Sequence, residues 1–220
     1  MSTEEIIIRD ANLKDAQRIL EIYSYYIKNT AITFEYEVPS EEDFKARMSK
    51  IMDRYPYLVI ERNGKIEGYA YAGPFVGRAA YDWSCEMTIY LDYKSCKVGL
   101  GRKIYEALEN RLKSMGILNL YAAIAYPEEE DDYLNYNSAN FHKHLGFNEV
   151  GRFYKCGYKF KHWYHLIWAE KIIGEHLYNQ PNIKNYRMCH EWKQNIFNGE
   201  KTKKKKGRET LFVSLPFFYK

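Results

Sequence analysis

The stretch from Trp83 to Lys103, WSCEMTIYLDYKSCKVGLGRK, joins a strand pattern to a helix pattern through a glycine-containing loop. Trp83 to Leu91 is rich in apolar residues, and from Leu100 apolar residues recur at helical spacing as far as Gly116, which stands where a helix C-cap belongs. A second strand pattern follows at Ile117 to Ala125. A strand, a helix and a strand in this order predict a parallel crossover, and hence a mixed sheet with helices on its faces.

Strand and helix patterns continue on both sides of this stretch. Before it, strands are predicted at Glu5–Arg9, Tyr57–Glu61 and Lys65–Ala72, and helices at Leu13–Ile27 and between Ser40 and Pro56. After it, a helix is predicted at Ser138–Leu145 and strands at Phe153–Tyr158 and Trp163–Ala169. Asn12 and Asp15 have the spacing of a capping box, and Asn63-Gly64 is typical of a two-residue hairpin turn. These elements fit one α/β domain.

The length of 220 residues and the hydrophobic content of 46% are enough for one domain with a full core. We predict a domain at 1–171 and a C-terminal extension at 172–220, where no sustained periodicity remains and where order is lost from about Gly199. The net charge of +4 depends on six basic residues between Lys201 and Arg208. Because the rest of the chain is close to neutral and such a run is usually a solvated tail, we expect no nucleic-acid partner; the alternative is that KTKKKKGR (201–208) adds salt-sensitive affinity for nucleic acid.

Three classes of protein are disfavoured by what the sequence does not contain. No apolar segment approaches the ~20 residues of a membrane span, and the start, MSTEEIIIRD, lacks the layout of a signal peptide. The four cysteines have no metal-ligand spacing. We therefore expect a cytoplasmic protein with free thiols, no membrane contact and no metal.

Gly99 and Gly101 allow two interpretations. Backbone N–H groups that lead into a helix N-terminus form an anion site, and glycine lets a phosphate approach the backbone closely. Alternatively, the two glycines only make a tight turn between the strand and the helix. The dinucleotide pattern GxGxxG is absent because its third glycine position holds Ile104, and no Walker loop is present.

The loop resembles the pyrophosphate loop of the GNAT acetyltransferase superfamily, [QR]-x-x-G-x-[GA], with Cys96 where Gln or Arg is usual. Ala70 to Leu91 (AYAGPFVGRAAYDWSCEMTIYL) resembles the region before that loop in the phosphinothricin and methionine sulfoximine N-acetyltransferase subfamily. Further resemblance lies in TAITFEYEVPS (Thr30 to Ser40), NSANFHKHLGF (Asn137 to Phe147) and GYKFKHWYHLIW (Gly157 to Trp168). In total it runs from about Ile6 to about Lys171.

The resemblance implies a GNAT fold, with a mostly antiparallel mixed sheet, helices on both faces and strands that splay apart at an acetyl-CoA site. It implies acetyl-CoA as co-substrate and a homodimer. The residues that it assigns to acetyl-CoA are Ile89, Tyr90, Leu91, Lys97, Val98, Gly99, Leu100, Gly101, Arg102, Asn137 and Ser138. Because PEEEDDY (127–133) lengthens the preceding loop, Asn135 is an alternative to Asn137. His165 and Lys161 replace the Asp and Gly common in the subfamily.

Two residues are candidates for catalysis. An amine must lose a proton before it attacks a thioester, and the resemblance gives Glu86 the role of base; partial burial that raises its pKa would suit it to this role. Otherwise Glu86 is a half-exposed glutamate on a strand. His142 matches a histidine of the subfamily, and is a candidate general acid or contact for the departing thiol. Otherwise it is a packed or solvated helix residue.

The acceptor is predicted to be a small amine of amino-acid type. Arg78 is the candidate partner for its carboxylate, because a guanidinium holds a carboxylate through two hydrogen bonds. Phe34, Glu35, Tyr81 and Trp83 are predicted to line the pocket, or else are ordinary core or rim residues. The alternatives to this activity are acetylation of a protein or peptide amine, and a non-catalytic acyl-CoA-binding module.

Overall fold

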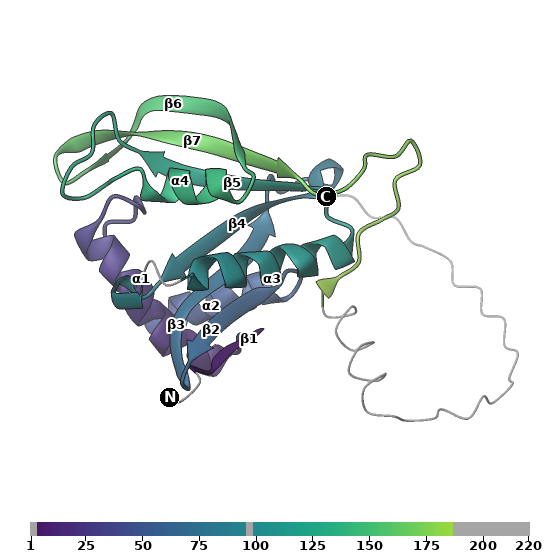
Figure 1. Ribbon diagram of the computed structural model, residues 1–220, viewed down its shortest axis with the longest axis horizontal. Coiled ribbons are helices and arrows are strands. Elements are labelled where there is room, and N and C mark those ends of the chain that lie inside the picture. The colour runs from purple at the N-terminus through teal and green to yellow at the C-terminus, as the bar shows by residue number, and fades with distance from the viewer. Residues whose placement is uncertain (1–3, 96–98, 187–220) are drawn as a thin grey trace, which may run out of the picture.

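The computed structural model of the protein describes residues 4–95 and 99–186 and is shown in Figure 1. The described residues form one sheet in the spatial order β1-β2-β3-β4-β5-β7-β6. Its strands are β1 (Ile6–Asp10), β2 (Tyr57–Arg62), β3 (Lys65–Pro74), β4 (Ser84–Leu91), β5 (Asn119–Tyr126), β6 (Asn148–Lys159) and β7 (His162–Ile172). Only β4 and β5 run parallel among these pairs, so the predicted mixed and mostly antiparallel sheet is confirmed.

Four α-helices of the described ranges cover the two faces of the sheet: α1 (Ala16–Asn29), α2 (Glu41–Met52), α3 (Leu100–Met115) and α4 (Asn137–His144). Helices α1 and α2 pack on one face of β2 and β3, and α3 packs on the other (Figure 1). The cap before α1 is the predicted capping box, since Asn12 Oδ1 accepts from Lys14 N and Asp15 Oδ2 accepts from Asn12 N. None of these helices is long and apolar enough to span a bilayer.

The alternation of side chains along β2 and β3 divides the core into two layers. Leu58 and Ile60 pack with α3, whereas Tyr57, Val59 and Tyr69 pack with α1 and α2. Glycines close the turns as predicted: Gly64 (φ 77°) lies in the β2–β3 hairpin, and Gly116 (φ 92°) ends α3 in the left-handed conformation that favours glycine.

Strands β4 and β5 pair over three residues only, from Ser84–Asn119 to Glu86–Tyr121, and then diverge. Figure 1 shows the resulting opening, with β1 to β4 on one side and β5 to β7 on the other. Helix α4 lies beside β5 at this opening. The predicted splay is therefore confirmed, and it begins directly after Glu86.

Beyond β7 the described chain runs along the C-terminal end of α3. Ile173 N donates to Leu118 O and Lys184 N to Met115 O, each at 2.8 Å. Tyr186 is buried, its hydroxyl donates to Asp10 Oδ1 at 2.5 Å, and it accepts from Arg111 Nε at 2.8 Å. The segment 173–186 is thus packed against the domain. The part of the extension for which we predict a loss of order, from Gly199, lies outside the described residues.

Candidate active site

The opening between β4 and β5 contains a cavity of about 230 Å³. Strand β4 contributes Glu86 to Tyr90, β5 contributes Ala122 to Ala125, and α4 contributes Ser138 and His142; Ile32 and Tyr71 complete the lining. Because β3 pairs with one edge of β4, the backbone groups of Met87 to Leu91 that point the other way face the opening instead of β5. The cavity therefore has backbone donors along one wall.

Glu86 stands where the pairing of β4 and β5 ends. Its side chain is half-buried, and burial raises the pKa of its carboxyl above the usual value. No charged group of the described residues offsets this effect. A carboxylate in this setting has an increased affinity for a proton and contact with a cavity, which are the two properties of a general base.

His142 is 4% exposed, and both of its ring nitrogens have hydrogen-bond partners. Nδ1 lies 2.8 Å from Ser138 O, and since a carbonyl only accepts, Nδ1 carries the proton. Nε2, 3.0 Å from the Tyr105 hydroxyl, then accepts from it. Burial lowers the pKa of His142 to about 4. At neutral pH the imidazole is neutral, its proton is held by the helix backbone, and it contributes to the wall of the cavity.

The glycine loop leads into α3 at the mouth of the opening. Gly99 is the N-cap of α3, with φ 82°, a conformation that few other residues adopt without strain. Gly101 is buried, and a Cβ there would lie 3.2 Å from the Phe141 ring of α4. Leu100 is buried and Arg102 is exposed. The predicted contacts Lys97 and Val98, with the departure Cys96, lie outside the described residues.

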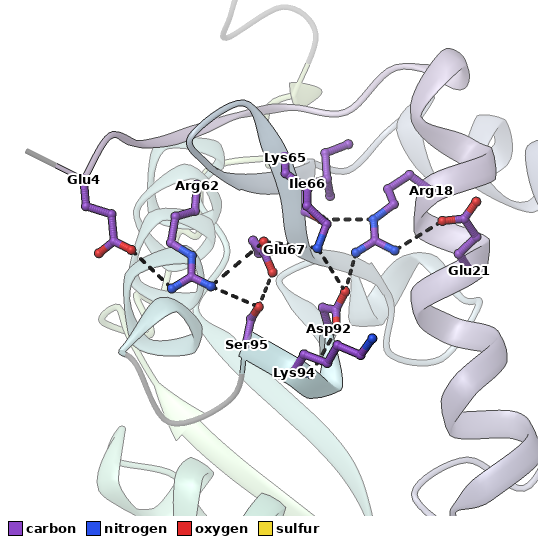
Figure 2. A network of polar contacts seen from close by, with 10 residues as sticks. All are labelled: Glu4, Arg18, Glu21, Arg62, Lys65, Ile66, Glu67, Asp92, Lys94 and Ser95. Atoms are coloured by element: carbon purple, nitrogen blue, oxygen red, sulfur yellow. Dashed lines mark hydrogen bonds and ion pairs between the residues drawn. The ribbon is translucent and has the colours of Figure 1, made fainter. Parts of the chain in front are cut away.

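A network of polar contacts lies directly before this loop, and Figure 2 shows it with the residues that it joins. The Ser95 hydroxyl donates to the Glu67 carboxylate, which is almost fully buried on β3. Arg62 Nη2 donates to Ser95 Oγ at 3.3 Å, and Lys65 Nζ lies 3.4 Å from Glu67 Oε1. The network thereby ties the last residue before the undescribed segment to the β2–β3 hairpin.

The second carboxylate of the network is Asp92, at the end of β4. Arg18 of α1 donates to it through Nη2, Lys94 N donates to Oδ1 at 3.0 Å, and Lys65 Nζ lies 3.7 Å away (Figure 2). Burial alone would raise the pKa of Asp92, but the bonds from Lys94 and Arg18 outweigh it and hold that pKa below its usual value. The start of the loop is therefore joined to α1 as well.

The residues at the start of α4 differ in their access to the cavity. Ser138 lines it, whereas Asn137 is exposed. Asn135 Oδ1 accepts from Asn137 N at 3.0 Å, so the alternative asparagine supports the first turn of α4. Ser138, Ile89 and Tyr90 are the predicted acetyl-CoA contacts that share this cavity with Glu86. Leu91 lies just outside it, where its carbonyl accepts from the Tyr26 hydroxyl.

One predicted acceptor residue, Glu35, lies in a pocket next to the cavity. It lines an adjoining pocket that shares Tyr71 and Tyr90 with the cavity of Glu86. Phe34, its neighbour, turns the other way, packs over Gly157 and stacks on Tyr164 with ring centroids 6.4 Å apart.

None of the five predicted acceptor residues lines the cavity itself, and the other three lie in or next to the segment between β3 and β4. Arg78 and Tyr81 are exposed in the segment between β3 and β4, where Tyr81 packs edge-on against Phe75. Trp83 Nε1 donates to Pro181 O at 2.7 Å and lines a separate pocket beside the C-terminal segment. The geometry therefore does not support a place for Trp83 in the same pocket as Glu86, because its side chain is used to hold residues 173–186.

Tyr71 and Thr88 line the candidate site, and Arg47 lines the adjoining pocket, although the sequence predicted none of them as a site residue. Tyr71 and Thr88 lie opposite each other on β3 and β4, and Arg47 reaches the adjoining pocket from α2. The alternation of Tyr69 and Tyr71 in β3 marks them as one face of a strand, but not which face. No group of His, Cys, Asp and Glu side chains within 4–95 and 99–186 has the arrangement of a metal site.

Comparison with known proteins agrees with this architecture. Residues 8–168 match the model of the acetyltransferase (GNAT) domain. The chain belongs to this family. The GNAT chain is 31% identical to the phosphinothricin N-acetyltransferase of Streptomyces viridochromogenes, over 71% of its own length and 82% of that of the relative.

Two further comparisons extend this result. The L-methionine sulfoximine/L-methionine sulfone acetyltransferase of Salmonella typhimurium is 27% identical, over 77% of this GNAT chain and 95% of the relative. The phosphinothricin acetyltransferase of Sinorhizobium meliloti, solved in complex with AcCoA, superposes with a TM-score of 0.74 at 30% identity, covering 82% of this chain and 95% of that one. The predicted GNAT fold and subfamily resemblance are confirmed.

Proposed function

We propose that this protein transfers the acetyl group of acetyl-CoA to the amine of a small amino-acid-like acceptor, by direct attack within a ternary complex. The observation that carries the proposal is Glu86, a half-buried carboxyl of raised pKa at the point where β4 and β5 part. The names of the relatives support the acceptor class, since these act on phosphinothricin and on methionine sulfoximine or sulfone. The neighbour in complex with AcCoA supports the co-substrate.

The opening fits acetyl-CoA in two respects. Unpaired backbone groups of β4 after Glu86 match the amides of a pantetheine arm, and N–H groups in the first turn of α3 from Gly99 onward suit a pyrophosphate. An N–H group of β4 that faces the opening also stabilises the thioester oxygen as negative charge develops on it. Gly99, Leu100, Gly101 and Arg102, with Ile89, Tyr90 and Leu91, remain the proposed contacts.

Glu86 accepts the proton of the acceptor ammonium, directly or through a water, and so supplies the neutral amine that attacks. No protein nucleophile takes part. The buried thiol of Cys85 has its pKa raised by burial, which makes it a packing residue and not a thiolate. His142, neutral and fixed by Ser138 and Tyr105, is proposed as a contact for the thiol end of the co-substrate.

The test is a screen of amines with acetyl-CoA, followed by release of free thiol. Small amino-acid-like amines, including methionine sulfone, methionine sulfoximine and phosphinothricin, should be acetylated, and peptide amines should not. Glu86→Gln should lower turnover by about 10²- to 10⁴-fold while acetyl-CoA binding is unchanged. Binding of acetyl-CoA without acetylation of any amine would instead indicate the non-catalytic module, and preference for peptide amines would indicate a protein acetyltransferase.

We further propose that the protein is a homodimer. Strand β6 is an edge of the sheet and exposes Phe153 (53%), Tyr154 (74%) and Tyr158 (45%), next to Trp163 (57%) on β7. A patch of this kind on an edge strand is typical of a surface that pairs. Sedimentation should show a dimer, and Phe153→Lys with Trp163→Lys should yield monomers. A cytoplasmic location and the absence of a nucleic-acid partner stay predictions. The lysine run on which the second prediction depends lies outside the described residues.

A further inference from the structure

A second pocket, which we call the tyrosine pocket, adjoins the cavity of Glu86 on the same face of the sheet. It has a volume of about 270 Å³ and lies between β2, β3, β4 and the helices α1 and α2. Its apolar lining consists of Tyr23, Tyr57, Tyr69, Tyr71, Tyr90, Phe44, Met48 and Ile51. Tyr71 and Tyr90 line both cavities, so the tyrosine pocket lies directly beside the cavity of Glu86.

Aromatic rings that stack on one another make up much of the lining of the pocket. Tyr57 and Tyr71 are stacked with centroids 4.8 Å apart and 12° between their planes, and Tyr69 lies parallel to Tyr71 within 3°. Flat parallel rings with a methionine beside them favour a flat apolar group over a polar one. A cavity of about 150 Å³ is enough for a benzene molecule. The tyrosine pocket therefore has room for a phenyl or indole side chain.

The rim of the pocket carries charge. Arg47 Nη1 lies 2.7 Å from Glu35 Oε1, and Lys50 is the third charged residue of the rim. The Arg47 side chain is 52% exposed, and its remaining N–H groups have no partner among the described residues. With two cations against one carboxylate, the rim favours an anionic group of the ligand.

Tyr71 joins these features. Its ring neighbours Thr88 across β3 and β4, and the charges of Glu86, Glu35 and Arg47 all act on its hydroxyl. Tyr71 thus lies between the cavity that contains Glu86 and the pocket that contains Arg47 and the aromatic lining. An α-amino acid carries its amine, its carboxylate and its side chain on one carbon atom. These three groups correspond to a base, a guanidinium and an aromatic pocket that lie close to one another.

We propose that the acceptor is an aromatic α-amino acid, with its side chain in the tyrosine pocket, its carboxylate on Arg47 and its amine at Glu86. This inference rests on the proposed acetyl transfer and narrows its acceptor. Arg47 takes the role that the sequence analysis gave to Arg78. Glu35 holds the Arg47 guanidinium in place, and segment 31–36 is itself fixed, since Lys159 Nζ donates to Thr33 O at 2.7 Å.

The experiment measures thiol release by the full chain with acetyl-CoA and L-phenylalanine, L-tryptophan, methionine sulfone, phosphinothricin or phenethylamine, which lacks the carboxylate. The aromatic amino acids should exceed methionine sulfone and phosphinothricin in kcat/KM by at least about tenfold. Arg47→Gln should raise KM for phenylalanine by about 10- to 100-fold and leave that for phenethylamine unchanged. The matched control is Lys45→Gln on the same helix, where Lys45 pairs with Glu41.

The outcomes separate the two proposals. Preference for methionine sulfone or phosphinothricin, or equal losses for phenylalanine and phenethylamine in Arg47→Gln, would overturn the aromatic acceptor and leave the acetyl transfer intact. Failure of every amine in the wider screen would overturn both. Because Arg47 is exposed, its variant should melt at the wild-type temperature, so a change in KM reports on the site.

Discussion

Acid should destabilise this protein through His142, because the folded state keeps that imidazole neutral. Its pKa is about 4 in the folded protein against 6.5 for an ordinary histidine. Below pH 6.5 the unfolded chain takes up a proton that the folded chain does not, so stability falls as the pH drops towards 4. For these two values, linkage gives a loss of about 2.5 kcal/mol between pH 8 and pH 4.5.

The measurement is urea unfolding of the wild type and of His142→Gln at pH 8, 6.5, 5.5 and 4.5. Glutamine can donate to Ser138 O and accept from the Tyr105 hydroxyl as histidine does, but it does not titrate. The free energy of unfolding of the variant should fall by about 2.5 kcal/mol less than that of the wild type over this range. Carboxylates titrate in both proteins and cancel in the comparison. Parallel pH curves would refute the reasoning.

Three further perturbations test other parts of the structure. Glu86→Gln should leave the melting temperature at pH 8 unchanged or raise it. Burial raises the pKa of the Glu86 carboxyl, so the charged carboxylate lowers the stability of the folded state above pH ~4.3, and a lower melting temperature of the variant would contradict this. Ser95→Ala removes a donor to buried Glu67 and should cost about 1–3 kcal/mol in urea unfolding and raise KM for acetyl-CoA, whereas an unchanged KM would limit the network to the fold. Gly157→Ala puts a Cβ 2.4 Å from the Phe34 ring and should cost about 1–3 kcal/mol, part of which Phe34→Leu should restore if that contact is the cause.

Most of the fold could be predicted because its signals are local. Asn12 Oδ1 accepts a hydrogen bond from Lys14 N, as expected for a residue that caps a helix. Asn63 and Gly64 both have the positive φ of a tight hairpin turn. Gly116 ends α3 as its position after Met115 indicates. Each of these residues acts within a few positions of itself in the chain, so a pattern in a single sequence is sufficient.

The site was less accessible to sequence reasoning because it depends on pairing between distant segments. Tyr71 joins the site only through its register with Thr88, and a strand pattern does not contain that register. Arg47 reaches the pocket only because α2 packs over β2 and β3. For Trp83, by contrast, a local rule would have corrected the prediction. Trp83 lies three positions before Glu86 in the predicted strand, and side chains an odd number of positions apart on a strand point to opposite faces.

Tyr186 has a consequence for how the protein can be divided. This last described residue contacts three pieces of chain: it bonds Asp10 at the end of β1, accepts from Arg111 on α3, and donates its backbone N–H to Arg54 O after α2. The match to the family ends at residue 168. A fragment trimmed to that match would lose a buried ring of its own core and uncover the end of α3. A fragment that keeps the described core complete therefore has to include at least the residues up to 186.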